Sequence, residues 1–386
     1  MKAEIVRLVN KFKRTANLPV FEETAKALSQ LRAEREKTVE RIVRIVLFDP
    51  GLCCQVLRAG NSVFYNPMGL PMRTISRAVA ILGFENLRSL ARTSPFFSAE
   101  DFNNKYLAQE LAISILSAHF AGKAALKKGL DGEEAYLGAL LKRLGRLVML
   151  RYAPEHYLKI RELAPRKRKE IFHLVGEKLA KQWNLPANVI ANLEGRELYI
   201  RPKRREYLCL YADLAAAGMV AGHGPRGWQH LFSTPDEINY CIQNLVKNGR
   251  HLPQAVLNEL PFDIAPEEIS EETDLGPFLP EEALRLCEKF LESLGKELKA
   301  QGSLFYREGD KIFALGNEEK EIKGPFQIVL NEDKILAKDG KIYVPLCFRK
   351  VPAVLLVFFR EKPLNPDELT GLKFIKKTIE NLLEKL

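Results

Sequence analysis

The spacing of hydrophobic residues changes once along the chain, close to residue 262. Before this point apolar residues recur three or four positions apart, as in Val39, Ile42 and Val46, which is the period of an amphipathic helix. No segment there alternates cleanly between apolar and polar residues. After it come short runs rich in Val, Ile, Phe and Tyr, separated by Gly, Asn and Asp turn signals. The chain is therefore predicted to fold as an almost wholly α-helical domain over 1–262, followed by an α+β domain.

An acidic segment lies where the spacing changes. Between Asp263 and Asp274 there are six acidic residues and no basic one, with Pro and Gly residues inside and just beyond. Such a segment stays solvated, so we predict a linker over 263–280 and a second domain over 281–386. The sign of the net charge changes in the same place. Residues 1–262 carry 40 Lys and Arg against 25 Asp and Glu, whereas residues 263–386 carry 19 Lys and Arg against 24 Asp and Glu.

The second domain begins and ends with helical patterns. A helix is expected from Pro280 to about Ala300, and another from Asn365 to Lys385. Between them we expect an antiparallel sheet with the helices packed on one face, which is an α+β plan. The apolar stripe of the first helix suits either a seam between two copies of the chain, and hence a homodimer, or a cover for its own sheet. The strands are predicted at 303–308, 311–316, 326–330, 341–348 and 352–360.

One run of motifs in the helical part suggests a family. Asp49-Pro50 is followed by Leu52, then by Asn61-Ser62 and Phe64 at the end of an apolar helical run. This pattern resembles the HDOD family, the HD-related output domains of bacterial signalling proteins, and the resemblance covers about residues 12–220. It implies an all-helical fold in which an N-terminal helical subdomain packs on a degenerate copy of the HD metal-phosphohydrolase helices. Asn61 and Ser62 are expected to stop their helix, although a contact with a partner stays open.

HD hydrolases hold a divalent metal with histidines and carboxylates, and the metal activates water for attack on a phosphate ester. In this chain the resemblance implies a vestigial HD site, in which only Asp213 keeps the family's residue. One oxygen ligand beside two cations cannot hold a catalytic metal, so we expect no cofactor and no phosphohydrolase activity. His173 stands one residue out of register with a family histidine. The residues at the family's metal-ligand positions are Ile113, Lys142, Arg143, Phe172, Arg196, Glu197 and Asp213.

Arg143 falls on the apolar face of a helix predicted to run from Tyr136 through Val148. An unpaired buried charge is strongly unfavourable, so the cation must reach water or find an anion. Asp213 is the natural candidate, and our hypothesis is an Arg143–Asp213 ion pair in the former metal site. Two alternatives stay open: Arg143 extends to solvent, or Arg143 and Lys142 hold a phosphate-bearing ligand.

Positive charge is concentrated between Lys142 and Arg205, where there are 17 bases and six acids. So much positive charge attracts polyanions whatever their sequence. A cyclic dinucleotide, a nucleic acid or an acidic partner protein would satisfy it, and so would the chain's own acidic linker and second domain. The residues predicted to contact such an anion or partner are Arg166, Lys167, Arg168, Arg201, Lys203, Arg204 and Arg205.

The second domain also has a family resemblance. The run KIYVPLCF (341–348), followed by PAVLLVFFR (352–360) between a lead-in helix and a closing helix, is similar to the GAF or PAS-type sensor folds. That resemblance implies a small-molecule pocket. The alternative is that the six phenylalanines between Phe305 and Phe359 only fill a core.

Together these features predict a non-catalytic, cytoplasmic signalling protein of a bacterium. Its expected partner is another signalling protein. A cyclic-dinucleotide or nucleic-acid binding protein and a residual phosphodiesterase remain alternatives. No stretch approaches the about 20 apolar residues that span a bilayer, so no membrane partner is expected.

Overall fold

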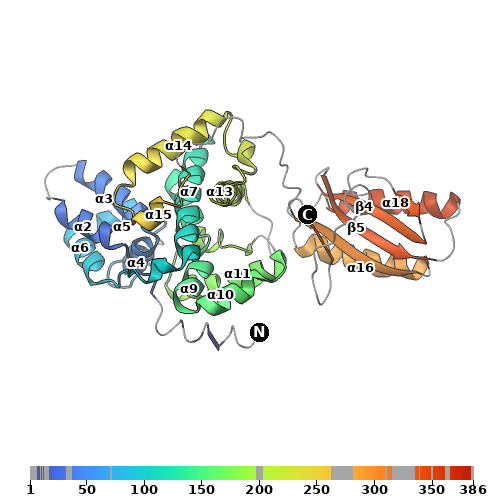
Figure 1. Cartoon of the computed structure of the whole chain (residues 1–386), viewed down its shortest axis with the longest axis horizontal. Coiled ribbons are helices and arrows are strands. Elements are labelled where there is room, and N and C mark those ends of the chain that lie inside the picture. Colours follow the sequence, from blue (N-terminus) through green and yellow to red (C-terminus); the bar gives the residue numbers. More distant parts are fainter. Residues whose placement is uncertain are drawn as a thin grey trace. The chain divides into compact units, whose positions relative to one another are not determined.

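The computed structural model describes residues 17–31, 37–69, 72–196, 203–261, 281–298, 300–308, 311–314, 335–338, 340–348, 351–360 and 366–383, and four single residues before them (Arg7, Leu8, Asn10 and Phe12). The chain forms two compact units. The larger is helical and the smaller combines two described helices with a five-stranded sheet (Figure 1). The linker predicted at 263–280 lies outside the described residues, so the domain boundaries stay a prediction.

Helices make up the larger unit, as the hydrophobic spacing predicts. Among its described residues the only β pairing is an isolated bridge between Val20 and Phe96. The helices up to residue 261 are α2 (Glu22–Gln30), α3 (Lys37–Leu47), α4 (Pro50–Gly60), α5 (Ile75–Leu82), α6 (Phe84–Thr93), α7 (Lys105–Lys127), α8 (Gly132–Leu140), α9 (Leu144–Tyr152), α10 (Pro154–Arg161), α11 (Pro165–Gln182), α12 (Ala187–Ile190), α13 (Arg204–Val220), α14 (Pro235–Asn248) and α15 (Gln254–Leu257), with the short 3₁₀ turns η1 (Asp101–Asn103) and η3 (Trp228–His230).

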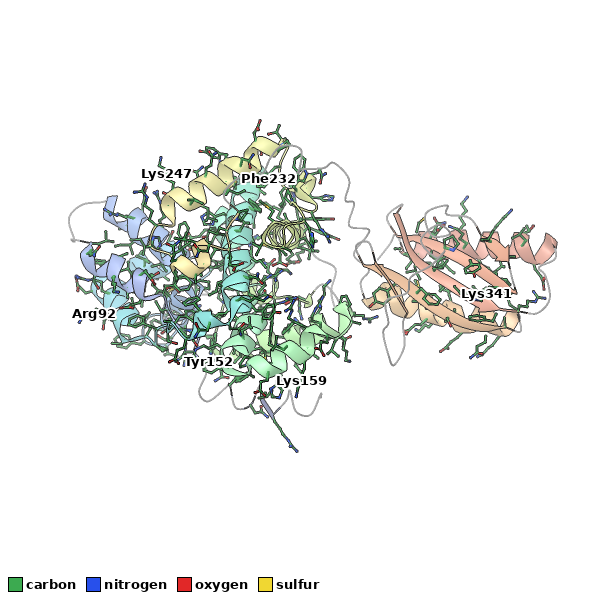
Figure 2. All side chains as sticks on the ribbon, viewed as in Figure 1. Arg92, Tyr152, Lys159, Phe232, Lys247 and Lys341 are labelled. Atoms are coloured by element: carbon green, nitrogen blue, oxygen red, sulfur yellow. The ribbon has the colours of Figure 1, made fainter. Side chains whose placement is uncertain are left out.

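Helix α7 is the centre of this unit. Apolar and small side chains occupy all its faces, which is typical of a helix buried on every side. It contacts α8, α9, α13, α14 and α15, and Figure 1 shows it running through the middle of the larger unit. Phe120 of α7 packs edge-on against Phe232, whose ring centroid lies 5.6 Å away (Figure 2). Glu110 is the exception to the apolar character of α7, because it is a carboxylate only 5% exposed to solvent.

Helix α4 ends where the Asn61-Ser62 motif predicts, and it begins at Pro50, directly after Asp49. The Asp49 carboxylate accepts hydrogen bonds from the backbone N–H groups of Leu52 (2.9 Å) and Phe21 (2.8 Å), so it caps α4 and holds the chain before α2. Burial raises the pKa of Asp49 to about 7, despite these hydrogen bonds. At the other end Asn61 is the C-cap residue, which confirms that it stops the helix.

The prediction of one helix from Tyr136 through Val148 is wrong. Two helices cover this segment, because α8 ends at Leu140 and α9 begins at Leu144. Two contacts with distant parts of the chain lie beside the break. A Cβ atom added at Gly145 would lie 2.2 Å from the Phe172 carbonyl oxygen, so α9 meets α11 backbone to backbone. The turn at 141–143 also frees the Lys142 carbonyl, which accepts a hydrogen bond from the Glu194 N–H (2.9 Å).

The smaller unit has the predicted order of helix, antiparallel strands and helix. Its helices are α16 (Glu281–Glu297) and α18 (Pro366–Leu383). The strands are β1 (Gln301–Glu308), β2 (Lys311–Ala314), β3 (Leu336–Lys338), β4 (Lys341–Phe348) and β5 (Val351–Phe359), in the sheet order β2-β1-β5-β4-β3 with every pair antiparallel. The short β3 was not predicted, and the strand expected at 326–330 lies outside the described residues.

One core joins both helices of this unit to the sheet. Cys287 and Leu294 of α16 pack in the same cluster as Ile379 of α18 and as Val344 and Phe358 of the sheet. The apolar stripe of α16 therefore covers its own sheet, and the homodimer stays a prediction. In neither unit does a described helix combine the length and the apolar character needed to cross a bilayer.

Candidate functional site

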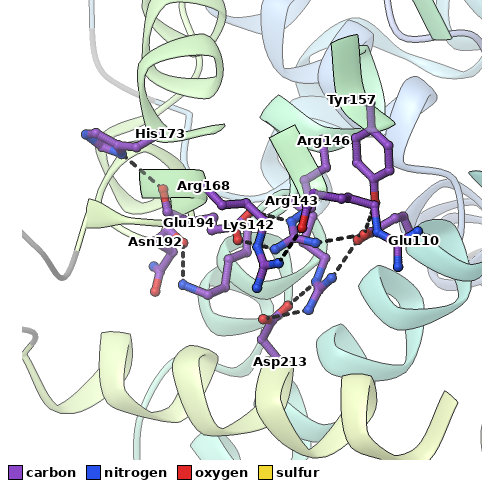
Figure 3. Close-up of polar contacts among 11 residues, drawn as sticks. Glu110, Lys142, Arg143, Arg146, Tyr157, Arg168, His173, Asn192, Glu194 and Asp213 are labelled. Carbon is purple, nitrogen blue, oxygen red and sulfur yellow. Dashed lines mark hydrogen bonds and ion pairs between the residues drawn. The ribbon is translucent and has the colours of Figure 1, made fainter. Parts of the chain in front are cut away.

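Five charged side chains from separate segments meet in the interior of the larger unit, and we call them the charged cluster (Figure 3). Helices α7, α9 and α13, the turn before α9 and the loop after α12 supply one residue each. Apart from Arg143 and Arg146, these residues are far apart in sequence, so only the tertiary fold brings the charges together. The members are Glu110, Arg143, Arg146, Glu194 and Asp213.

Arg143 joins two carboxylates. Its Nε and Nη2 donate to the two carboxylate oxygens of Asp213, at 2.6 and 3.0 Å, and its Nη1 donates to Glu110 Oε2 at 2.5 Å. The hypothesis of an Arg143–Asp213 ion pair is confirmed. Extension of Arg143 to solvent is wrong, since its side chain is 8% exposed. The alternative that Arg143 and Lys142 hold a phosphate-bearing ligand stays a prediction.

Arg146 extends the charged cluster on its other side. Its Nη1 donates to Glu110 Oε1 at 2.9 Å and its Nε to Glu194 Oε2 at 2.6 Å. Its guanidinium carbon lies 4.8 Å from the centre of the Phe172 ring, a cation–π distance. The Tyr157 hydroxyl donates to Glu110 Oε1 at 2.7 Å. Three carboxylates thus share two guanidinium groups, and every carboxylate receives at least one charge-assisted hydrogen bond.

Contacts within the charged cluster favour the ionised forms of Glu110 and Arg143. Burial alone would raise the pKa of Glu110, but Arg146, Arg143 and the Tyr157 hydroxyl outweigh it and lower that pKa from 4.5 to about 2. Burial likewise acts to lower the pKa of Arg143, and the Asp213 and Glu110 carboxylates reverse this and raise it. Glu110 and Arg143 therefore stay charged at any physiological pH.

These residues do not fit a divalent metal. A metal ion would need carboxylate or imidazole lone pairs that are free to coordinate it, whereas the carboxylate oxygens here already accept hydrogen bonds from Arg143 and Arg146. It would also lie against two fixed positive charges, which repel it. Throughout the part of the chain that the structure describes, no group of three or more His, Cys, Asp or Glu side chains could hold a metal ion.

The other predicted positions of the vestigial HD site lie around the charged cluster or apart from it. Lys142 is buried and its Nζ donates to the Asn192 carbonyl at 3.4 Å. Phe172 contacts the charged cluster through its ring, and Ile113 is a buried apolar residue of α7. Arg196 pairs with Glu177 at 3.5 Å. Glu197 lies outside the described residues.

His173, one residue out of register with a family histidine, is buried at the edge of the charged cluster. Its Nδ1 lies 3.2 Å from the Glu194 carbonyl oxygen and its Nε2 lies 3.8 Å from a carboxylate oxygen of Glu177. These contacts fix the ring against the loop that carries Glu194. The histidine therefore supports that loop.

The basic residues predicted to bind an anion lie in two helix N-termini. Arg166, Lys167 and Arg168 are in the first turn of α11. Lys203 and Arg204, at the start of α13, are exposed, whereas Arg205 forms an ion pair with Glu134 of α8. Arg201 lies outside the described residues. Anion binding by these residues stays a prediction.

Three members of the charged cluster were not predicted from the sequence. Glu110 had a signal, because it is a charged residue in an otherwise apolar stretch and lies one helical turn before Ile113. Arg146 is one turn after Arg143 and could have been found in the same way. Glu194 follows a four-residue helix in a loop, and nothing in the local sequence distinguishes it.

Comparison with protein families identifies a large part of the helical unit. Residues 18–196 match the family model described as the HDOD domain. This confirms the resemblance for those residues, and the predicted extension to residue 220 lies beyond the match. None of the curated proteins is similar enough to match the chain.

Several solved structures are similar to the chain at low identity. The MmoQ response regulator from Methylococcus capsulatus str. Bath is 18% identical, with a TM-score of 0.46, over 64% of this chain and 98% of the regulator. A virulence factor from Campylobacter jejuni subsp. jejuni is 17% identical, with a TM-score of 0.47, over 70% of this chain and 99% of that protein. An HDOD domain protein with unknown function from Geobacter sulfurreducens is 17% identical, with a TM-score of 0.29, over 70% and 92%.

Proposed function

We propose that this chain, whose residues 18–196 form an HDOD domain, is a regulatory protein that acts by binding and not by catalysis. One observation carries the proposal. Arg143 occupies the position of the second residue of the family's HD dipeptide. It forms buried ion pairs with both Asp213 and Glu110. The one family carboxylate that the chain keeps is thereby paired with a guanidinium, and both of its oxygens already accept hydrogen bonds.

The charged cluster suits a rigid docking body. It connects α7, α9, α13 and the loop after α12, and breaking a buried ion pair is strongly unfavourable, so these segments are held in one arrangement. A scaffold of this kind presents a fixed surface to a partner. We propose that the partner is another signalling protein of a bacterial cytoplasm.

We further propose that the smaller unit is a GAF-like domain. Its lead-in helix α16, its antiparallel sheet and its closing helix α18 support this assignment. A partner or ligand bound to one unit would then act by changing its arrangement with the other. The small-molecule pocket that a GAF-like domain implies stays a prediction.

A second candidate function is the binding of a cyclic dinucleotide or another polyanion. The observation that favours it is the exposure of Lys203 and Arg204 at the N-terminus of α13, where the helix dipole adds to their positive charge. Arg205 is less available, because Glu134 already pairs with it.

One experiment with two readouts separates these functions. The full chain is incubated with a cyclic dinucleotide and Mn²⁺, and both product formation and retention of the nucleotide are measured. We expect no hydrolysis above the protein-free rate, because no metal is held beside Asp213. Hydrolysis of the cyclic dinucleotide above the protein-free rate would contradict the proposal.

Matched charge reversals decide the second readout. Lys203→Glu/Arg204→Glu removes the candidate anion surface, and Lys247→Glu/Arg250→Glu makes the same change in charge at exposed residues of and after α14 (Figure 2). Retention that is lost only in the first variant would establish the polyanion-binding function. Absence of retention in the unmodified chain would leave protein binding as the function.

A further inference from the structure

The loop that follows α4 displays three large apolar side chains to solvent. Val63, Phe64 and Met68 are 84%, 83% and 83% exposed. Monomeric proteins seldom gather fully exposed apolar residues in one place unless the place is used for binding. We call residues 61–69 the apolar loop.

Hydrogen bonds fix the backbone at the base of the apolar loop. The Asn61 side chain accepts from the Met72 N–H at 2.9 Å and donates to the Asn184 carbonyl at 3.3 Å, while the Asn184 side chain donates to the Asn61 carbonyl at 3.0 Å. Within the loop the Asn66 N–H donates to the Ser62 carbonyl at 2.8 Å. The exposed side chains are therefore presented by an ordered backbone, and folding of the chain does not use them.

The sequence segments that carry the apolar loop and its base contain more basic than acidic residues. Residues 50–84 contain three arginines and no Asp or Glu, and residues 178–193 contain two lysines and no Asp or Glu. Arg58, Arg73 and Lys181 each lie within three residues of Asn61, Met72 and Asn184, which form the base of the loop. Two of these cations already have an acidic neighbour: Lys181 pairs with Glu177 at 3.0 Å and Arg73 lies 3.9 Å from Glu134.

We propose that the apolar loop docks on an anionic membrane surface. Insertion of the three apolar side chains and attraction of the surrounding bases to acidic lipid headgroups are the two signals that peripheral membrane binding needs. The Phe64 and Tyr65 rings, which lie edge to face at 4.8 Å, are of the kind found at membrane interfaces.

Two other occupants fit less well. A second copy of the chain would bring the same positive charges together, and like charges repel. A protein partner needs about 800 Å² on each side of a stable interface, which the three exposed side chains of one short loop do not supply alone. The expectation of no membrane partner rested on the lack of a spanning stretch, and surface docking requires no such stretch. This proposal is independent of the function proposed for the charged cluster.

Vesicle binding tests the proposal with the full chain. Flotation is measured with vesicles of phosphatidylcholine and with vesicles of equal parts phosphatidylcholine and phosphatidylglycerol. We expect the chain to bind the anionic vesicles at least about tenfold more tightly, and salt to weaken that binding. Phe64→Ser/Met68→Ser should reduce it by about tenfold or more, without a change in melting temperature, because both side chains are exposed.

A matched control distinguishes binding through the apolar loop from non-specific binding through other exposed apolar side chains. Leu126→Ser/Phe374→Ser replaces two apolar side chains that are 66% and 73% exposed elsewhere in the chain, and it should bind like the unmodified protein. In a Phe64→Trp variant, anionic vesicles should shift the emission to the blue, whereas the native Trp183 and Trp228 are buried. Failure of the unmodified chain to bind anionic vesicles, or equal binding by the Phe64→Ser/Met68→Ser variant, would overturn membrane docking and leave a protein as the occupant of the loop.

Discussion

Replacing Arg143 by methionine is expected to lower the free energy of unfolding by about 3–5 kcal/mol, because it leaves the buried carboxylates of Asp213 and Glu110 without their shared cation. Urea unfolding followed by circular dichroism measures this loss. A substitution that merely shortened a surface side chain would not have such an effect.

Arg92→Met is the matched control, because Arg92 is exposed on α6 and its loss should change the free energy of unfolding by no more than about 0.5 kcal/mol. Restoring an apolar site with Arg143→Met/Asp213→Leu should recover part of the stability, since removal of both partners leaves one fewer unpaired charge. If Arg143→Met unfolded at the same urea concentration as Arg92→Met, the charged cluster would not be a structural element.

Acid should weaken the larger unit through Glu110. The pKa of Glu110 is about 2 in the folded chain and 4.5 as an ordinary carboxyl group, so folding favours its ionised form. The resulting stability is fully present above about pH 4.5 and is lost as the pH falls towards 2, and a shift of this size corresponds to roughly 3 kcal/mol. Urea unfolding at a series of pH values between these limits measures the loss.

Glu110→Gln isolates this contribution from that of the other carboxyl groups. The variant should be less stable at neutral pH, because Gln cannot neutralise Arg143 and Arg146. Its stability should also fall less steeply with acid, since residue 110 no longer titrates. An identical slope in the two proteins would show that Glu110 is not the group that couples folding to pH.

Much of the fold could be predicted because it depends on local spacing. The recurrence of apolar residues in α3 and α7 and the stop at Asn61 both depend on residues within a few positions of one another. The break between α8 and α9 could not be predicted in this way. Leu140 and Leu144 keep helical spacing across the turn, and the close approach of Gly145 to the Phe172 carbonyl involves a residue far along the chain.

In the candidate site, too, some contacts could be predicted from the sequence and others depend on the tertiary fold. The Arg143–Asp213 pair could be predicted because a cation on an apolar face requires an anion, and the family resemblance put Asp213 near it. The bridging role of Glu110 and the pairing of Arg146 with Glu194 depend on how α7, α9 and the loop after α12 meet. The short strand β3 was missed because three residues carry too little pattern, and it forms by pairing with β4.

The metal content of the full chain, measured after equilibration with Mn²⁺, Fe²⁺ or Zn²⁺ and removal of free ions, tests most directly whether a guanidinium has taken the place of the metal. The ion pairs of Arg143 with Asp213 and Glu110 predict no stoichiometric metal, and no change in content when Asp213 is replaced by asparagine. One equivalent of a divalent metal that is lost with Asp213→Asn would contradict the account.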